Sequence, residues 1–258
     1  MKKINKSPPL NNLTEYAQNY PQHNWNDFRN NNQGNDYQTV KNVIFTDQGK
    51  LCAFCENEVI DIHKQRIEHF HAKADLSDLN HNWALDWGNL IGVCFGGSDV
   101  DRTIHPLPDN LSCDAHKDYL IVKNKLPMAC EGFLLHPLKL PAFPCLFDFD
   151  KRTGELRAKA DYGQISIEHN HFDTLIELVE QTIEILNLNC DRLNKQRLAV
   201  LNQYNQEIKK ARIANDQNIH LKLATRWFQS RWLPFFTTRR ILLNGHAEHY
   251  LSSLNFDG

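Results

Sequence analysis

The sequence predicts an α+β fold, with short strands and loops in the first half and helices in most of the second half. Two observations predict it. From Cys52 to Leu120 the pattern is one of short strands and loops that end in a helix. From Phe172 onward, apolar residues recur at helical spacing, and a single proline, Pro234, interrupts them. We therefore expect a loop-rich core followed by a mainly α-helical C-terminal region.

The composition is that of an ordinary globular protein. The chain has 258 residues, of which 41% are hydrophobic and 23% charged, and a net charge of about −2 that gives no general support for nucleic-acid binding. No apolar run approaches the roughly 18 residues that a membrane span needs, and no signal-peptide core follows Met1. We therefore expect a cytoplasmic protein with no membrane partner. Its seven cysteines are then metal ligands or structural thiols rather than disulfides.

The first segment, residues 1–50, is expected to contain an N-terminal arm and one helix. Residues 1–22 are polar and include three prolines, which indicates a loosely held arm with at most a short helix. The asparagine-rich stretch 24–35 is typical of an exposed loop. Apolar residues at helical spacing then predict a helix over 37–46.

The second segment, residues 51–120, contains a predicted structural zinc site. A CxxC turn lets two thiolates reach one ion at about 2.3 Å, and two more cysteines follow next to glycine or small polar residues. The four predicted ligands are Cys52, Cys55, Cys94 and Cys113. The alternative is that Cys94 or Cys113 is a buried free thiol and that His116 or another histidine is the fourth ligand.

An acidic residue and a histidine, Glu68 and His69, lie between the two pairs of cysteines on a predicted strand over 65–70. Adjacent strand residues point to opposite faces, but at a strand end both can turn toward one ion. A carboxylate is a hard oxygen donor suited to Mg²⁺ or Mn²⁺, and an imidazole can take a proton from water near neutral pH. Taken alone, such a pair is usually an ordinary surface feature, and the cysteines on both sides are what favour a reactive site.

The rest of the chain divides into an extended segment and a helical segment. Residues 121–170 contain four prolines, so they are expected to form an extended connection followed by a β-hairpin over 146–161. Residues 171–258 are expected to be helical. The predicted helices lie over 172–186, 193–213, 221–232 and 241–251.

The motifs of residues 51–120 resemble those of the HNH endonucleases, a family with a ββα-metal fold. The matching residues are Cys52-Ala53-Phe54-Cys55, Ile67-Glu68-His69-Phe70, Asn89-Leu90, Cys94 and Cys113 with Lys117 four residues later. Within this family the pattern is similar to the PtuB-type proteins of Septu and retron anti-phage systems, including the stretch TIEILNLN at 182–189. The resemblance covers roughly residues 51–195 and implies that residues 51–120 are a zinc-stabilised nuclease core.

The resemblance also implies roles for individual residues. His69 would be the general base, Glu68 a ligand of the catalytic ion, and Asn89 the residue that holds the loop between the strands. Asp114 replaces the asparagine that binds metal in many members, so its ligand role rests on that substitution being tolerated. His71 is expected either to contact phosphate or metal or to be a solvated histidine at the strand end. Lys117 is expected either to lie near phosphate or to pack at the start of a helix.

The activity implied is hydrolysis of phosphodiester bonds in DNA or RNA, with a structural Zn²⁺ and a catalytic Mg²⁺ or Mn²⁺. The implied partners are a PtuA-like ATPase, with or without a retron reverse transcriptase and its msDNA. The competing hypothesis is a non-catalytic, zinc-stabilised subunit that bridges such an ATPase and nucleic acid. The intact pair of Glu68 and His69 favours the nuclease, because a scaffold has no use for a base beside a hard ligand.

Positive charge is concentrated in residues 186–240, which contain 11 lysines and arginines against three acidic residues. This asymmetry suits a surface that follows a phosphate backbone. The residues predicted to contact nucleic acid are Arg192, Arg197, Lys209 and Arg212. Two alternatives remain, since charged helices are often simply solvated and the tryptophans and phenylalanines nearby could instead dock a protein partner.

Overall fold

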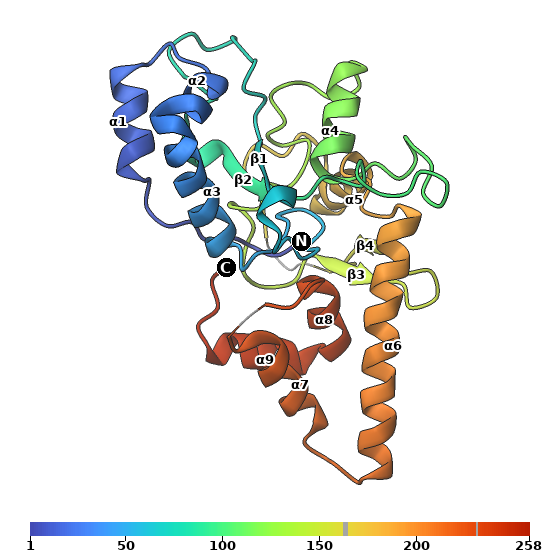
Figure 1. The fold of residues 1–258 in the computed structure, drawn as a ribbon. Coiled ribbons are helices and arrows are strands. Elements are labelled where there is room, and N and C mark those ends of the chain that lie inside the picture. The colour runs from blue at the N-terminus through green and yellow to red at the C-terminus, as the bar shows by residue number, and fades with distance from the viewer. Residues whose placement is uncertain (162–164, 231) are drawn as a thin grey trace.

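The computed structural model describes residues 1–161, 165–230 and 232–258, and it confirms the predicted α+β class (Figure 1). The α-helices are α1 (Asn11–Asn19), α2 (Trp25–Asn30), α3 (Asn35–Asp47), α4 (Cys113–Val122), α5 (Leu175–Ile185), α6 (Asp191–Ile213), α7 (Ile219–Phe228), α8 (Phe236–Leu243) and α9 (Gly245–Ser253). The strands are β1 (Arg66–His69), β2 (Leu90–Val93), β3 (Phe147–Phe149) and β4 (Leu156–Ala158). Short 3₁₀ turns lie at Asn31–Gly34, Ile62–Lys64 and Trp87–Asn89.

The centre of the molecule is the antiparallel pair β1–β2, followed in the chain by α4. Glu68 pairs with Ile91, and His69 pairs with Leu90. All residues of β2 are buried, because α3 covers it closely. A Cβ on Gly92 would lie 2.9 Å from the Phe45 ring of α3, so glycine is what allows this approach. The order of strand, strand and helix is the one predicted for residues 51–120.

The N-terminal region differs from the prediction. Residues 1–22 do not form a loosely held arm, because Ile4 is buried in the main core and α1 buries one face beside α3. Residues 24–35 are not simply an exposed loop, because α2 begins there with Asn24 and Asp27 capping each other's backbone N–H groups. Trp25 and Phe28, three residues apart, supply the buried face of α2. This apolar spacing was hidden by the many asparagines around it.

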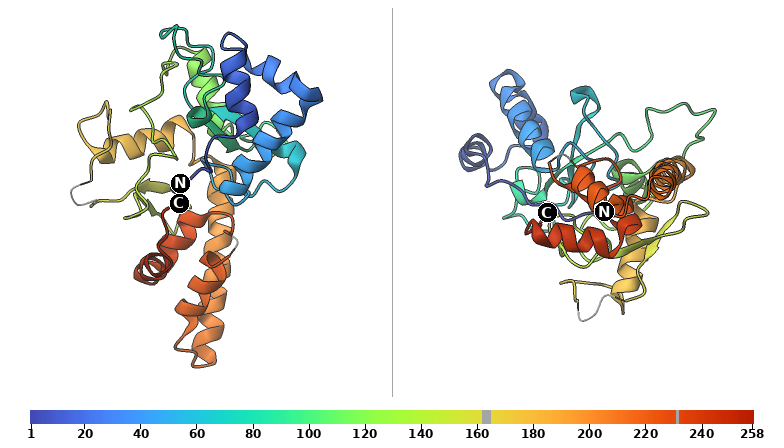
Figure 2. Two further views of the ribbon diagram at one scale, coloured as in Figure 1. Left: turned by 90° about the vertical axis from the view of Figure 1, so that its left-hand side faces the viewer. Right: turned by 90° about the horizontal axis from the view of Figure 1, so that it is seen from below.

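The C-terminal half follows the predicted helices with two changes. The predicted helix over 221–232 ends as α7 at Phe228, and the one over 241–251 is divided into α8 and α9 by Asn244, whose φ is +48°. The predicted hairpin is present as β3–β4. In the views of Figures 1 and 2, α6 extends well away from the rest of the molecule, with α7 running back beside it.

One hydrophobic core joins most of these elements. Its buried residues come from all four predicted segments, including Ile4, Phe54, Phe147 and Leu193. Two smaller clusters lie beneath α1–α3 and among α7–α9. The proposed segment boundaries therefore remain predictions about the chain and do not mark separate cores. No helix in the described ranges has the length and apolar character to cross a bilayer.

Candidate functional site

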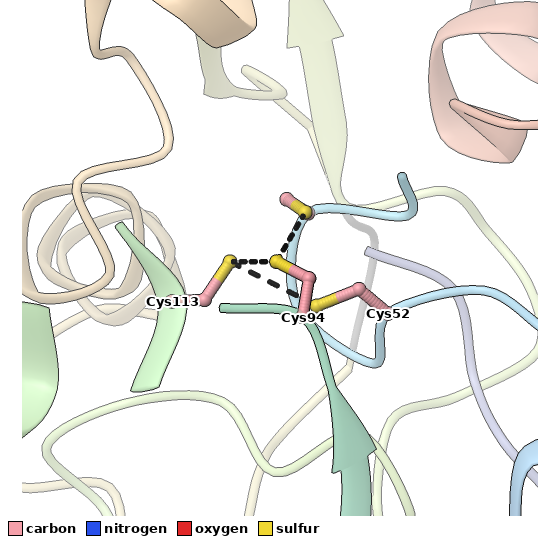
Figure 3. A group of neighbouring side chains, drawn as sticks. Cys52, Cys94 and Cys113 are labelled. Atoms are coloured by element: carbon pink, nitrogen blue, oxygen red, sulfur yellow. Dashed lines mark hydrogen bonds between the residues drawn. The ribbon is translucent and has the colours of Figure 1, made fainter. Parts of the chain in front are cut away.

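The four predicted zinc ligands converge. The Sγ atoms of Cys52, Cys55, Cys94 and Cys113 all lie within 4.8 Å of one another. Cys52 and Cys113 are 3.8 Å apart, Cys55 and Cys94 are 3.7 Å apart, and Cys94 and Cys113 are 3.9 Å apart (Figure 3). Four sulfurs bound tetrahedrally at about 2.3 Å would be separated by about 3.8 Å. The arrangement therefore fits one zinc ion with no open coordination position.

The loops that carry these thiols are held by backbone hydrogen bonds. The N–H of Ala53 donates to the Gly92 carbonyl at 2.9 Å, which ties the CxxC turn to β2. Cys113 has a left-handed φ of +56°, and its N–H donates to the Leu186 carbonyl at 2.8 Å. Such a φ is unfavourable for a residue with a side chain, so the surrounding contacts and the cluster must hold it. The alternative ligand, His116, is engaged elsewhere, since its Nδ1 lies 2.8 Å from the Ile185 carbonyl.

Electrostatics also favour a cation among the thiols. Burial opposes ionisation of Cys52, yet hydrogen bonds from the other three cysteines bring the pKa of Cys52 well below its usual value. The hydrogen bond between Cys52 and Cys113 contributes most to raising the pKa of Cys113 well above its usual value. The thiols therefore cannot all ionise without added positive charge, which Zn²⁺ would supply.

A second cluster contains three carboxylates from β1 and α4. One oxygen each of Glu68, Asp114 and Asp118 lies within 4.8 Å of the others. Oxygens bound to one octahedral ion at about 2.1 Å are about 3.0 Å apart when adjacent and about 4.2 Å apart when opposite, and both values lie within this limit. The Oδ1 atom of Asp114 is buried and has no hydrogen-bond partner in the described residues, so it fits a cation ligand.

Asp118 was not predicted from the sequence. It lies four residues after Asp114 on α4, a spacing that places two side chains on the same face of a helix. That spacing was visible in the sequence, but nothing there showed that this face of α4 lies against Glu68. Asp118 is the exposed member of the cluster and so forms its solvent side.

Lys117 is the buried cation of this cluster. Its Nζ donates to the Glu68 carboxylate, to the His69 carbonyl at 3.0 Å and to the Phe70 carbonyl at 3.1 Å. These three bonds use all the donors of an ammonium group, and the side chain is 1% exposed. Lys117 therefore fixes the end of β1 and orients Glu68, and it has no donor left for a phosphate in this conformation.

The nearby cations do not offset the burial and mutual repulsion of the three carboxylates. Burial and the neighbouring Asp114 raise the pKa of Glu68 well above its usual value, although Lys117 opposes this. Burial and Asp114 likewise raise the pKa of Asp118. Both shifts mean that the cluster lacks positive charge. A divalent ion bound there would favour the ionised forms of Glu68 and Asp118.

His69 directly follows Glu68 and is the last residue of β1. Its Nε2 is 3.1 Å from the carbonyl oxygen of Ala84, and because a carbonyl can only accept, Nε2 carries the proton. Burial lowers the pKa of His69 to about 3, so the ring is neutral near pH 7 and Nδ1 is unprotonated. Nδ1 has no hydrogen bond to any residue in the described ranges, and so it can accept a proton.

The imidazole of His69 is covered in this structure. His69 is only 4% exposed. The Trp25 ring of α2 packs against the imidazole in an edge-on arrangement, with ring centroids 4.8 Å apart. Two hollows in the surface, of about 280 and 700 Å³, are lined by residues other than His69 and Glu68. His69 is therefore largely covered in this structure, and Trp25 of α2 forms part of that cover.

Asn89 holds the loop between the strands. Its Nδ2 donates to the His71 and Trp83 carbonyls at 2.9 and 2.8 Å, and its Oδ1 accepts from the His71 N–H at 2.7 Å. The His71 ring lies between the carboxylates of Asp75 and Glu131, at 2.8 and 3.0 Å, and stacks on Trp83. Neither ring nitrogen is free in this geometry, so contact of His71 with phosphate or metal stays a prediction that requires these carboxylates to move.

The predicted nucleic-acid contacts fall into two groups. Arg192 and Arg197 are buried: Arg192 donates to Ser112, and Arg197 donates to the Gly154 carbonyl. Burial opposes the charge of Arg192, but the electrostatic effect of nearby cysteines outweighs it and raises the pKa of Arg192. The prediction that these two arginines contact nucleic acid is therefore wrong for this structure, because they serve the zinc site and the core. The helical pattern showed which residues were charged but not which faces were covered.

Lys209 and Arg212 are exposed on the projecting half of α6. No ion pair joins either of them to an acidic side chain within the described ranges. Their neighbours on α7 are paired, since Lys222 contacts Asp216 at 2.7 Å. Arg231, another member of the predicted basic stretch, lies outside the described residues.

The chain has a relative among known proteins. It is 38% identical over 250 residues to the "Retron Ec83 putative HNH endonuclease" of Escherichia coli. The alignment covers 94% of this chain and 94% of the relative, so it includes both clusters and the helical half. No protein-family profile matches the chain.

Proposed function

We propose a metal-dependent mechanism for this chain, which belongs to the HNH endonuclease family and is therefore a phosphodiester hydrolase. In this proposal Glu68, Asp114 and Asp118 hold the catalytic ion on the ββα unit formed by β1, β2 and α4. The single observation that carries it is the buried, unpartnered Oδ1 of Asp114 within a group of three carboxylates. A Mg²⁺ or Mn²⁺ ion bound there would stabilise negative charge on the phosphate and on the leaving oxygen.

The general base of the proposal is His69. Its unprotonated Nδ1 would take a proton from the attacking water while the bond from Nε2 to Ala84 keeps the ring oriented. Lys117 positions both partners, because it binds the Glu68 carboxylate and the backbone carbonyl of His69. The zinc ion would have no part in the chemistry, since four thiolates leave no free position.

The mechanism requires a conformational step. Water and phosphate must reach Nδ1 of His69, but the edge of Trp25 lies against the ring. Trp25 belongs to the small cluster under α1–α3, which is separate from the main core. A shift of α2 would therefore expose His69 without unfolding the zinc site, and binding of substrate or a partner protein is the natural cause of such a shift.

The metal proposal is tested by cleavage of plasmid DNA and of tRNA after dialysis against buffer free of divalent ions, with the zinc content of the chain measured in parallel. We expect no cleavage until Mg²⁺ or Mn²⁺ is added. Asp114→Ala should raise the metal concentration for half-maximal activity at least about tenfold, as loss of groups around a metal does. The control is Asp101→Ala, in the exposed loop before α4. Zinc-loaded protein that cleaves equally well without added ions would contradict the proposal.

We further propose that Lys209 and Arg212, exposed on the projecting half of α6, contact the nucleic-acid substrate. A 23-residue helix spans roughly 34 Å, so Lys209 and Arg212 can follow a phosphate backbone beyond the core. Replacing Lys209, Lys210 and Arg212 together with alanine should weaken binding of nucleic acid and reduce the slope of log K against log salt by about 0.9 for each phosphate that is no longer neutralised. The control is Lys222→Ala, since that lysine is already paired with Asp216. An unchanged salt slope in the triple variant would exclude this surface.

The biological role proposed is that of an effector in anti-phage defence. Its support is that the relative from Escherichia coli is named for a retron. In this proposal the nuclease acts with a PtuA-like ATPase, with or without a reverse transcriptase and its msDNA, and with DNA or RNA as substrate. Co-purification of this chain with the product of an adjacent ATPase gene is the measurement that tests the partner.

A further inference from the structure

We propose that Arg66 is a catalytic residue that contacts the scissile phosphate directly. The inference rests on the proposed function, because it takes the carboxylate cluster as the place where a phosphate is cleaved. It adds a residue that the sequence motifs did not single out. Three features support it: the direction of the Arg66 side chain, its accessibility and the donors that it keeps free beside Asp114.

The direction of Arg66 follows from β1. Arg66 and Glu68 are two residues apart on a strand, so their side chains project from the same face. The guanidinium accordingly reaches α4, where its Nη2 lies 3.6 Å from Oδ2 of Asp114. This distance exceeds that of a good hydrogen bond, so the pair is loose and the planar group can still turn toward a ligand.

Accessibility separates Arg66 from Lys117, the buried cation of the cluster. The Arg66 side chain is 41% exposed, whereas the Asp114 side chain is 3% and the Lys117 side chain 1% exposed. All three donors of Lys117 are already bonded to Glu68 and to the end of β1. Arg66 has five donors, and apart from the loose contact with Asp114 none of them has a hydrogen-bond partner in the described part of the chain. Arg66 thus lies at the rim of the cluster with donors still free, and it is the cation whose side chain reaches a carboxylate of the cluster from the face of β1 that carries Glu68.

The chemistry matches that position. A guanidinium binds two phosphate oxygens at once and stays charged at every usable pH. A phosphate held between Arg66 and an ion at Asp114 would gain a second positive partner as negative charge builds up on its oxygens. The nearby Phe95 ring, 5.6 Å from the guanidinium carbon, supports the side chain in this direction. A lysine could supply the charge but not the two parallel bonds.

The test compares the cleavage kinetics of three variants with those of the unaltered chain in Mg²⁺. Arg66→Ala should lower kcat by about 10²-fold, the size of effect seen when one donor to a developing charge is removed. Arg66→Lys should recover part of that loss, and added guanidinium should partly rescue Arg66→Ala. The matched control is Arg157→Ala, because Arg157 is also a half-exposed strand arginine paired with an aspartate, 3.0 Å from Asp150.

The outcomes separate this inference from the proposed function. If Arg66→Ala keeps kcat within about threefold of the unaltered chain while His69→Ala is inactive, the role of Arg66 is excluded and the nuclease assignment stands. If Arg66→Ala changes only KM, a catalytic contact is excluded. It is also excluded if kcat falls equally in Arg157→Ala. Thermal unfolding and zinc content of Arg66→Ala should equal those of the unaltered chain, since the side chain is at the surface. If Arg66→Ala loses zinc or stability, the loss of rate is structural and the inference fails.

Discussion

Replacing His69 with alanine is expected to reduce phosphodiester cleavage by about 10²–10⁴-fold, the usual contribution of a general base. The physical reason is that His69 offers an unprotonated Nδ1 on a ring held in place by the bond from Nε2 to Ala84. The other imidazole close to the site, that of His71, has both nitrogens against carboxylates and cannot replace it. The measurement is the single-turnover rate on DNA and on tRNA in Mg²⁺ and in Mn²⁺.

Two controls keep this result interpretable. His63→Ala removes an exposed histidine just before β1 and should leave the rate unchanged. His69→Gln keeps a polar group that fills part of the space beside Trp25, and so it should fold and bind metal as the unaltered chain does while remaining inactive. A His69→Ala variant with the full rate would remove the base assignment and favour the competing hypothesis of a zinc-stabilised binding subunit.

Removing the zinc site is expected to have the largest effect on stability. Structural zinc sites contribute apparent binding free energies of about 10–16 kcal/mol at pH 7, which is as large as the whole stability of a typical domain. The segment that carries Cys52 and Cys113 contains few regular elements, and Cys113 has an unfavourable φ of +56°. We therefore expect Cys52→Ser, or prolonged chelation, to abolish cooperative folding. Elemental analysis of the unaltered protein should give one zinc per chain.

The matched control is Cys145→Ser, which changes a half-buried cysteine outside the cluster. That variant should retain one zinc and a cooperative transition, and its midpoint should move by only a few degrees. Circular dichroism and differential scanning calorimetry measure both properties. A Cys52→Ser protein that unfolds at the same temperature as the unaltered chain would show that the thiols do not hold a structural ion.

The predictions that succeeded depended on residues close in sequence or on apolar residues that recur at the period of a helix. The CxxC turn, the apolar faces that became α5 and α6, and the turn between β3 and β4 each involve neighbours that interact locally. The predictions that failed depended on which surfaces meet. Nothing local in the asparagine-rich stretch showed that Trp25 would be buried against His69, and nothing in α6 showed that Arg197 would be covered.

The sequence by itself identified the four cysteines of the predicted zinc site and the pair of Glu68 and His69. It also determined the helical character of the second half. These properties follow from residue chemistry and from the fixed periods of helices and strands. Only the tertiary structure decided that Asp118 joins Glu68, that Lys117 is bound to the end of β1, that Arg66 keeps free donors and that α2 covers His69. The physical reason is that such contacts join residues far apart in the chain, and their selection depends on how all buried surfaces pack together.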